Sequence, residues 1–152
     1  MDKSQPKIII ACDHAGFDLK EYLKSQLLAS GYDVYDCGCK SADVSVDYPD
    51  YANIACKKIN PQLSQIFLEE LAILICGSGI GISISANRHK NIRAALCNNI
   101  KLAKLARAHN NANVLCLGSR FIKEKKALAI IKIFLKTKFE GGRHEARVNK
   151  LS

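Results

Sequence analysis

The chain has 152 residues, a length typical of one domain, and 48% of them are hydrophobic, so it can bury a core without disulfides or a structural metal. It contains no apolar stretch of the roughly 18 residues that a membrane-spanning helix needs, and its first residues lack the apolar centre of a signal peptide. The seven cysteines are an odd number at irregular spacing, which favours reduced thiols. We therefore expect a single cytoplasmic domain over residues 1–152 that does not bind membranes.

The formal net charge of +9 is concentrated in the second half of the chain. Residues 1–70 carry 7 basic and 11 acidic side chains, whereas residues 71–152 carry 16 basic and 3 acidic ones. This asymmetry favours an anionic ligand. Nucleic acid is a weaker candidate, because all five tyrosines lie in the acidic half, away from the basic residues. Many of these basic residues form a lysine series between Lys123 and Lys138, which is typical of a solvated helix face.

The apolar residues alternate along the chain between the two-residue period of strands and the wider spacing of helices. Strands are expected at residues 7–12, 32–36, 71–76, 93–97 and 113–117. Helices are expected at residues 17–30, 49–59, 82–87, 100–109 and 123–136. This order predicts an α/β protein with three layers, in which helices cover both faces of a doubly wound, five-stranded parallel sheet of the Rossmann-like type.

The segment LAILICGSGIGIS, residues 71–83, is the most informative part of the chain, because an apolar strand leads directly into a glycine-rich turn. Cys76 stands where the strand ends, and Ser78 adds a hydroxyl to the turn. Glycines let backbone N–H groups approach a ligand closely; here they are Gly77, Gly79 and Gly81. A tight connection with a buried structural cysteine remains an equally good interpretation of this segment by itself.

Polar residues follow the other predicted strands, at the edge where open α/β sheets bind their ligands. Asp13 and His14 come after the first strand, and Arg120 follows Ser119 after the last one. Each has a plain structural explanation, such as a helix cap for Asp13 or a surface charge for Arg120. Together they predict a ligand site at the carboxyl edge of the sheet.

Two segments farther along the chain carry groups suited to phosphate binding and proton transfer. Arg143 and Arg147 are four residues apart, so a helical turn there would direct both guanidinium groups to one anion. An exposed basic helix end is the more common explanation of this spacing. His109 stands at the end of a predicted helix and can exchange a proton near neutral pH, although it can equally serve as a charge at the helix C-terminus.

Six segments, in collinear order over almost the whole chain, resemble the B type of ribose-5-phosphate isomerase. They are ACDHAGFDLK, DYPDYA, ILICGSGIGISISANR, IRAALC, AHNNANVLCLGSR and FEGGRHEARV. The resemblance implies interconversion of ribose 5-phosphate and ribulose 5-phosphate through a cis-enediolate, in the non-oxidative pentose phosphate pathway, without a metal or other cofactor. It also implies a homodimer or a dimer of dimers with sites shared between subunits. Allose 6-phosphate or another hexose phosphate remains an alternative substrate within this family.

The resemblance further implies a role for each matching residue. Cys76 matches the base that moves a proton between C1 and C2, and His109 matches the group that opens the sugar ring. The enediolate oxygen is expected to lie against Gly77, Ser78, Gly79 and Gly81. The residues expected to bind the sugar hydroxyls are Asp13, Tyr48 and Asn110. The residues expected to bind the phosphate are His14, Arg120, Arg143 and Arg147.

The chain departs from the family pattern in two places. Ser78 replaces a common threonine but keeps the hydroxyl, and the connection NPQLSQIFLEE is longer than usual.

Three other classes of protein fit less well. A dinucleotide-binding module carries its glycine-rich turn after the first strand rather than the third. A thiol redox protein needs a resolving cysteine close to Cys76, and the chain contains no CxxC motif to supply one. A nucleic-acid-binding protein would have to use the basic second half alone.

Overall fold

The computed structural model describes residues 5–60 and 70–151. Five parallel strands form one sheet in the spatial order β2-β1-β3-β5-β4. The strands are β1 (Lys7–Cys12), β2 (Val34–Asp36), β3 (Glu70–Cys76), β4 (Ala94–Leu96) and β5 (Val114–Gly118). The helical elements are η1 (His14–Gly16), α1 (Phe17–Ala29), α2 (Tyr48–Lys58), α4 (Ile80–Ala86), α5 (Ile100–Asn110), α6 (Glu124–Lys136) and α7 (Arg143–Val148).

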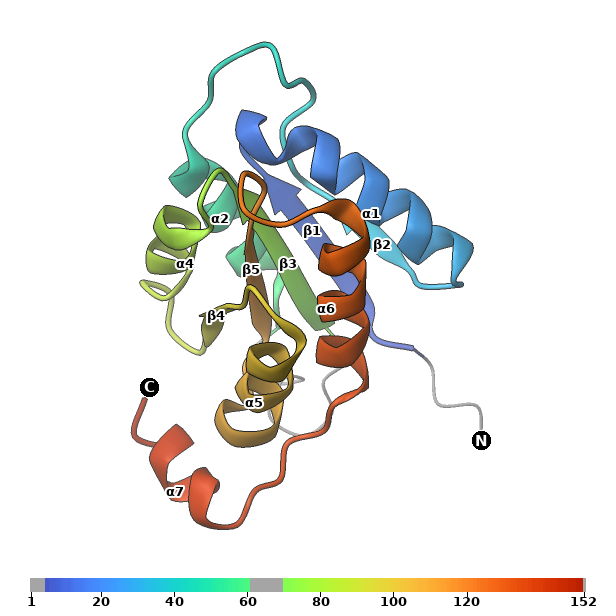
Figure 1. Ribbon diagram of the computed structural model, residues 1–152. Helices are drawn as coiled ribbons and strands as arrows, with labels where there is room; N and C mark the ends of the chain where they lie inside the picture. Colours follow the sequence, from blue (N-terminus) through green and yellow to red (C-terminus); the bar gives the residue numbers. More distant parts are fainter. Residues whose placement is uncertain (1–4, 61–69, 152) are drawn as a thin grey trace.

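Helices cover both faces of the sheet, with α1 and α6 on one side and α2 and α4 on the other (Figure 1). Successive side chains of β3 therefore enter two different cores. Ile73 and Ile75 pack with residues of α1, α5 and α6, whereas Leu74 and Cys76 pack with residues of α2 and α4. Burial on both faces explains the unbroken apolar run of β3. It also places the Cys76 thiol on the side of α2 and α4.

The predicted doubly wound parallel sheet is confirmed, and each predicted strand is present with small changes at its ends. The largest changes affect β2 and β4, which have three residues each and form the two edges of the sheet. An edge strand has a neighbour on one side only, so fewer hydrogen bonds define its ends. Most of the long connection NPQLSQIFLEE lies outside the described residues. Within the described ranges, no helix is long and apolar enough to cross a membrane.

A network of four charged side chains joins α1 to β2. The Lys20 side chain is 1% exposed, and its Nζ lies 2.6 Å from Asp36 Oδ2 and 2.7 Å from Glu21 Oε1. Lys24 Nζ contacts the same Asp36 oxygen at 2.7 Å. Burial alone would raise the pKa of Asp36, but hydrogen bonds from Lys20, Lys24 and the Gly38 N–H outweigh it and lower the pKa to about 2.

The low pKa of Asp36 predicts that this network loses its stabilising effect in acid. The carboxylate is charged in the folded state down to about pH 2, whereas in the unfolded chain it takes up a proton near pH 4. The contribution of Asp36 to the free energy of unfolding is therefore complete above about pH 4. About 2 kcal/mol of this free energy is lost as the pH falls through the pKa of the folded state. Urea unfolding should show a flatter pH dependence in Asp36→Asn than in the wild type across this range. The exposed Asp33→Asn variant is the control, and equal slopes for Asp36→Asn and the wild type would contradict the pairing.

Candidate active site

Cys76 and the turn that follows it form the centre of the candidate site. The cysteine is 4% exposed, and the Gly79 N–H donates a hydrogen bond to its Sγ over 3.2 Å. The Ile80 N–H donates to Ser78 Oγ over 3.1 Å. Gly79 has a φ of +77°, and a Cβ there would lie 2.5 Å from Leu96 Cδ1, so this position requires glycine.

Two other glycines of the turn bring large side chains against it. A Cβ on Gly77 would lie 2.6 Å from Arg120 Nη1, so the guanidinium group rests directly on this residue. A Cβ on Gly81 would lie 2.5 Å from Tyr48 Cζ, which places the phenol ring of Tyr48 against the start of α4. The turn after Cys76 therefore has a cation and a phenol hydroxyl among its neighbours.

The end of β1 supplies the predicted residues Asp13 and His14. The Asp13 N–H donates to Ile75 O, and Asp13 Oδ1 accepts a hydrogen bond from the Gly16 N–H over 3.1 Å. Asp13 is thus the cap of η1, and this role uses one of its two carboxylate oxygens. His14 Nδ1 lies 3.1 Å from the Val46 N–H. The same nitrogen lies 3.2 Å from Val46 O, so Val46 can hold the ring through Nδ1 in either tautomer, and both contacts involve Nδ1 rather than Nε2.

The end of β5 completes this edge of the sheet. Ser119 donates its backbone N–H to Cys76 O and its hydroxyl to Ala15 O. A cavity of about 680 Å³ opens beside it, between the starts of α1 and α6. The cavity is lined by Ala15, Asp18, Leu19, Ser119, Arg120, Ile122, Lys123, Glu124 and Lys125. The predicted residues that meet at this edge are Asp13, His14, Tyr48, Cys76, Gly77, Ser78, Gly79, Gly81 and Arg120.

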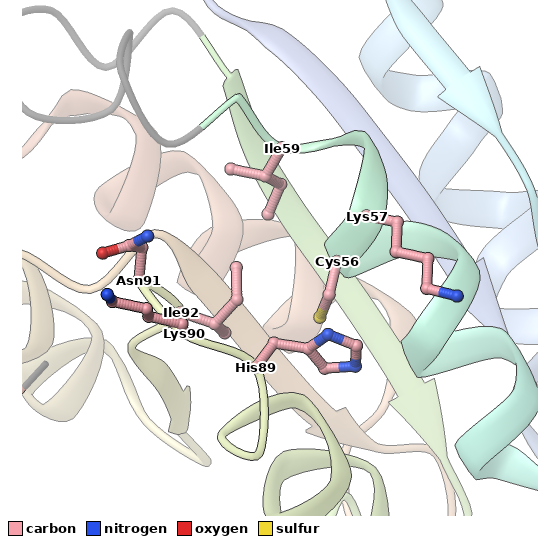
Figure 2. A pocket seen from close by; sticks show the side chains of 7 residues that line it. All are labelled: Cys56, Lys57, Ile59, His89, Lys90, Asn91 and Ile92. Atoms are coloured by element: carbon pink, nitrogen blue, oxygen red, sulfur yellow. The ribbon is translucent and has the colours of Figure 1, made fainter.

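A smaller cavity of about 230 Å³ lies near the opposite edge, between the end of α2 and the connection from α4 to β4 (Figure 2). Its lining consists of Cys56, Lys57, Ile59, His89, Lys90, Asn91 and Ile92. None of these residues was predicted to bind or transform a ligand. In Figure 2 the Lys57 ammonium group extends away from the other labelled side chains. The carboxyl edge of the sheet is therefore the better candidate for the active site.

The structure does not bring the remaining predicted residues to Cys76 within one chain. Helix α5 leads from the carboxyl end of β4 back to the start of β5, so His109 and Asn110 lie at the amino edge. Its 11 residues correspond to a length of about 16 Å. Helix α7, which carries Arg143 and Arg147, lies against this far end of α5 (Figure 1). Within one chain these four residues therefore lie away from Cys76, because a helix between parallel strands must run back along the sheet.

Sequence reasoning missed two groups of residues near the end of α5. Arg93 Nε donates to Asn111 O over 2.9 Å, and the buried Arg107 donates to Ala112 O over 2.7 Å. Burial and the nearby Arg93 charge lower the pKa of Arg107 to about 10. These contacts fix the turn after α5. The sequence signal for its burial is that Arg107 stands between two small residues, Ala106 and Ala108, which are themselves buried.

The second missed group consists of Glu140 and His144. The rings of His109 and His144 stack with centroids 4.1 Å apart and planes at 13°. The Nε2 atoms of both rings face Glu140 Oε2, at 3.7 Å from His109 and 3.9 Å from His144. Glu140 and His144 stand in the FEGGRHEARV segment, but no residue spacing relates them to His109, which is distant in sequence.

Comparisons with known proteins extend over nearly the whole chain. Residues 8–151 match a family model described as Ribose/Galactose Isomerase. A putative sugar phosphate isomerase from Rickettsia bellii is 47% identical, over 95% of this chain and 96% of that protein. The structure of ribose 5-phosphate isomerase B from Anaplasma phagocytophilum has a TM-score of 0.90 at 46% identity, covering 98% of each chain.

A further structure is relevant to the ligand. Ribose-5-phosphate isomerase B from Mycoplasma genitalium, solved with bound ribulose-5-phosphate, has a TM-score of 0.89 at 43% identity and covers 95% of this chain and 93% of that one. Identities and coverage of this size, together with the family model, establish common ancestry and not only a shared fold. The chain therefore belongs to the ribose/galactose isomerase family.

Proposed function

We propose that this protein is an aldose–ketose isomerase that interconverts ribose 5-phosphate and ribulose 5-phosphate. The observation that carries the proposal is the setting of Cys76. Its thiol stands at the carboxyl end of a central strand, accepts the Gly79 N–H, and lies next to the turn on which Arg120 rests. A member of the same family has been solved with ribulose-5-phosphate bound. Family membership and the position of the thiol support the same chemistry.

In the proposed reaction, Cys76 acts as a thiolate base. It removes the proton from C2 of the open-chain aldose, and the electron pair moves into a C1–C2 double bond as negative charge develops on O1. The proton on O2 passes to O1, and the Cys76 thiol returns its proton to C1, which gives the ketose. The N–H groups of the turn and the Ser78 hydroxyl stabilise the enediolate, and one such donor contributes about 3–4 kcal/mol in well-studied enzymes.

This reaction needs no external oxidant or reductant, because C2 is oxidised while C1 is reduced within one molecule. We therefore propose that the enzyme works without a metal or nucleotide cofactor. All seven cysteines are free, which suits the reducing conditions of the cytoplasm. Asp13 and Tyr48 hold the sugar hydroxyls in this proposal, and His14 and Arg120 hold the phosphate.

A second copy of the chain supplies the groups that one chain leaves distant from Cys76. In this arrangement His109 of one subunit opens the sugar ring at the partner's Cys76 edge. Asn110 then contacts a hydroxyl, and Arg143 and Arg147 complete the phosphate site. The surface near Cys76 has the apolar character that such an interface requires. The exposed apolar side chains on α4, β4 and the start of α5 are Ile80, Ile84, Leu96, Ile100 and Leu102.

The substrate assignment can be tested by supplying purified protein with ribose 5-phosphate, allose 6-phosphate and galactose 6-phosphate in parallel. We expect the highest kcat/KM with ribose 5-phosphate, measured as the formation of ribulose 5-phosphate. A preference for allose 6-phosphate would contradict the pentose assignment while retaining the enediolate mechanism. Failure to convert any of the three phosphosugars would contradict the proposed function itself.

A further inference from the structure

Three side chains of metal-binding type converge at the far end of α5. His109, Glu140 and His144 each offer a ligand atom, and these atoms all lie within 4.8 Å of one another. The two Nε2 atoms lie 3.7 Å and 3.9 Å from the same Glu140 oxygen. Tetrahedral Zn²⁺ with bonds of about 2.0–2.1 Å separates its ligand atoms by about 3.4 Å. Shortening by a few tenths of an ångström brings the two nitrogen–oxygen pairs to that separation, whereas the two imidazole nitrogens, which lie within 4.8 Å of each other, must approach by more.

The backbone holds this cluster in place. The Glu140 N–H donates to Ala108 O over 3.0 Å, which ties the segment after α6 to the last turn of α5. Gly141 and Gly142 have φ values of +65° and +54°, a conformation that other residues adopt with strain. Their turn directs His144 back onto α5, where its side chain is only 12% exposed. Two of the three ligands thus come from one short, sharply turned segment.

The chemistry of the three ligands favours one class of ion. Two imidazoles and one carboxylate suit Zn²⁺ and similar divalent transition metals, and water fills the fourth position of such sites. Mg²⁺ and Ca²⁺ prefer oxygen ligands alone. The stacked rings must rotate for both Nε2 atoms to reach one ion, and the exposure of His109 and Glu140 permits this.

We propose that His109, Glu140 and His144 form a binding site for a divalent transition-metal ion of the Zn²⁺ type, and that the bound ion inhibits the enzyme. The ion would bind the Nε2 atom of His109, and this nitrogen could then no longer transfer a proton. The binding site stands on the geometry of the cluster alone, whereas the inhibition rests on the proposed function. The positive charges of Arg143 and Arg147 oppose a cation, so the affinity should be weaker than that of a structural zinc site.

Binding can be tested without any activity measurement by titrating the reduced, full-length protein with Co²⁺ and recording its absorption spectrum. We expect one Co²⁺ per chain, with visible bands of nitrogen and oxygen ligands and without the near-ultraviolet band of thiolate ligation. Removing a residue that only hydrogen-bonds to a metal ligand typically weakens metal binding by about 10- to 100-fold. Losing a direct ligand in His144→Gln or Glu140→Gln should therefore weaken Co²⁺ binding by at least as much. His89→Gln changes a partly exposed histidine outside the cluster and should bind Co²⁺ like the wild type.

Three results would overturn the binding site: no Co²⁺ uptake, a thiolate spectrum, or equal affinity in the wild type and both cluster variants. Circular dichroism confirms that each variant is folded. In a separate assay, Zn²⁺ should inhibit the conversion of ribose 5-phosphate, and a chelator should reverse the inhibition. The concentration for half inhibition should rise at least tenfold in Glu140→Gln, in step with its weaker binding. Metal binding without inhibition would contradict the inhibitory role and leave the site itself intact.

Discussion

Replacing Cys76 with alanine is expected to lower kcat for ribose 5-phosphate by about 10²- to 10⁴-fold, the range that general acid–base catalysis supplies. The variant loses the group proposed to carry the proton between C1 and C2 but keeps the turn N–H groups, Asp13 and Arg120. KM should therefore change little, because the lost thiol acts on the transferred proton and does not hold the bound sugar. Initial rates over a range of substrate concentrations separate the two constants.

A matched control is needed because the chain has six other cysteines. Cys56 is buried on α2 and has no role in the proposed mechanism, so Cys56→Ala should retain kcat close to the wild type. Thermal unfolding of both variants shows whether either substitution destabilises the fold. Undiminished kcat in Cys76→Ala would remove this thiol as the base, and an equal loss in Cys56→Ala would show that the effect is structural.

Mixing two inactive variants is expected to restore activity if the site is shared between subunits. Cys76→Ala and His109→Asn each inactivate both sites of a homodimer. In a mixed dimer, one site combines the two defects, while the other combines an intact Cys76 with an intact His109. Random exchange makes half of the dimers mixed, so about a quarter of wild-type activity should return. Refolding an equimolar mixture and measuring the isomerase rate tests this directly.

The control for this experiment is a mixture of Cys76→Ala with Cys76→Ser, which leaves no intact Cys76 edge in any dimer. This mixture should stay inactive. If the Cys76→Ala and His109→Asn mixture also stays inactive while size-exclusion chromatography shows that subunits have exchanged, the shared site is contradicted. His109 would then have to act in a different way from the one proposed.

The sequence predicts the sheet and its carboxyl edge well, for identifiable physical reasons. The apolar run of β3 indicates burial on both faces, and its boundaries agree with the prediction to within one residue. Residues at the end of a strand are placed by the strand itself, as are Asp13 directly after β1 and Cys76 as the last residue of β3. Their position at one edge then follows from the parallel topology. Asp13 shows how a structural and a ligand-binding interpretation can both apply, since its cap uses Oδ1.

The sequence predicts less about groups whose position depends on contacts between distant segments. His109 ends a helix that returns along the sheet, so it faces away from Cys76 within the same chain. Its stacking with His144 depends on the turn at Gly141 and Gly142 and on the hydrogen bond from Glu140 to the end of α5. Residue spacing contains no information about such contacts. The contact between subunits in the proposed mechanism is likewise not encoded in any local pattern.

The most direct measurement is the conversion of ribose 5-phosphate in D₂O, followed by NMR of the product. A proton carried by the Cys76 thiol can exchange with solvent before it returns to carbon. We therefore expect deuterium at C1 of ribulose 5-phosphate with the wild type, and both exchange and conversion should be lost in Cys76→Ala. Conversion without deuterium incorporation, as in a direct hydride shift from C2 to C1, or unchanged exchange in Cys76→Ala would contradict the proposed role of Cys76.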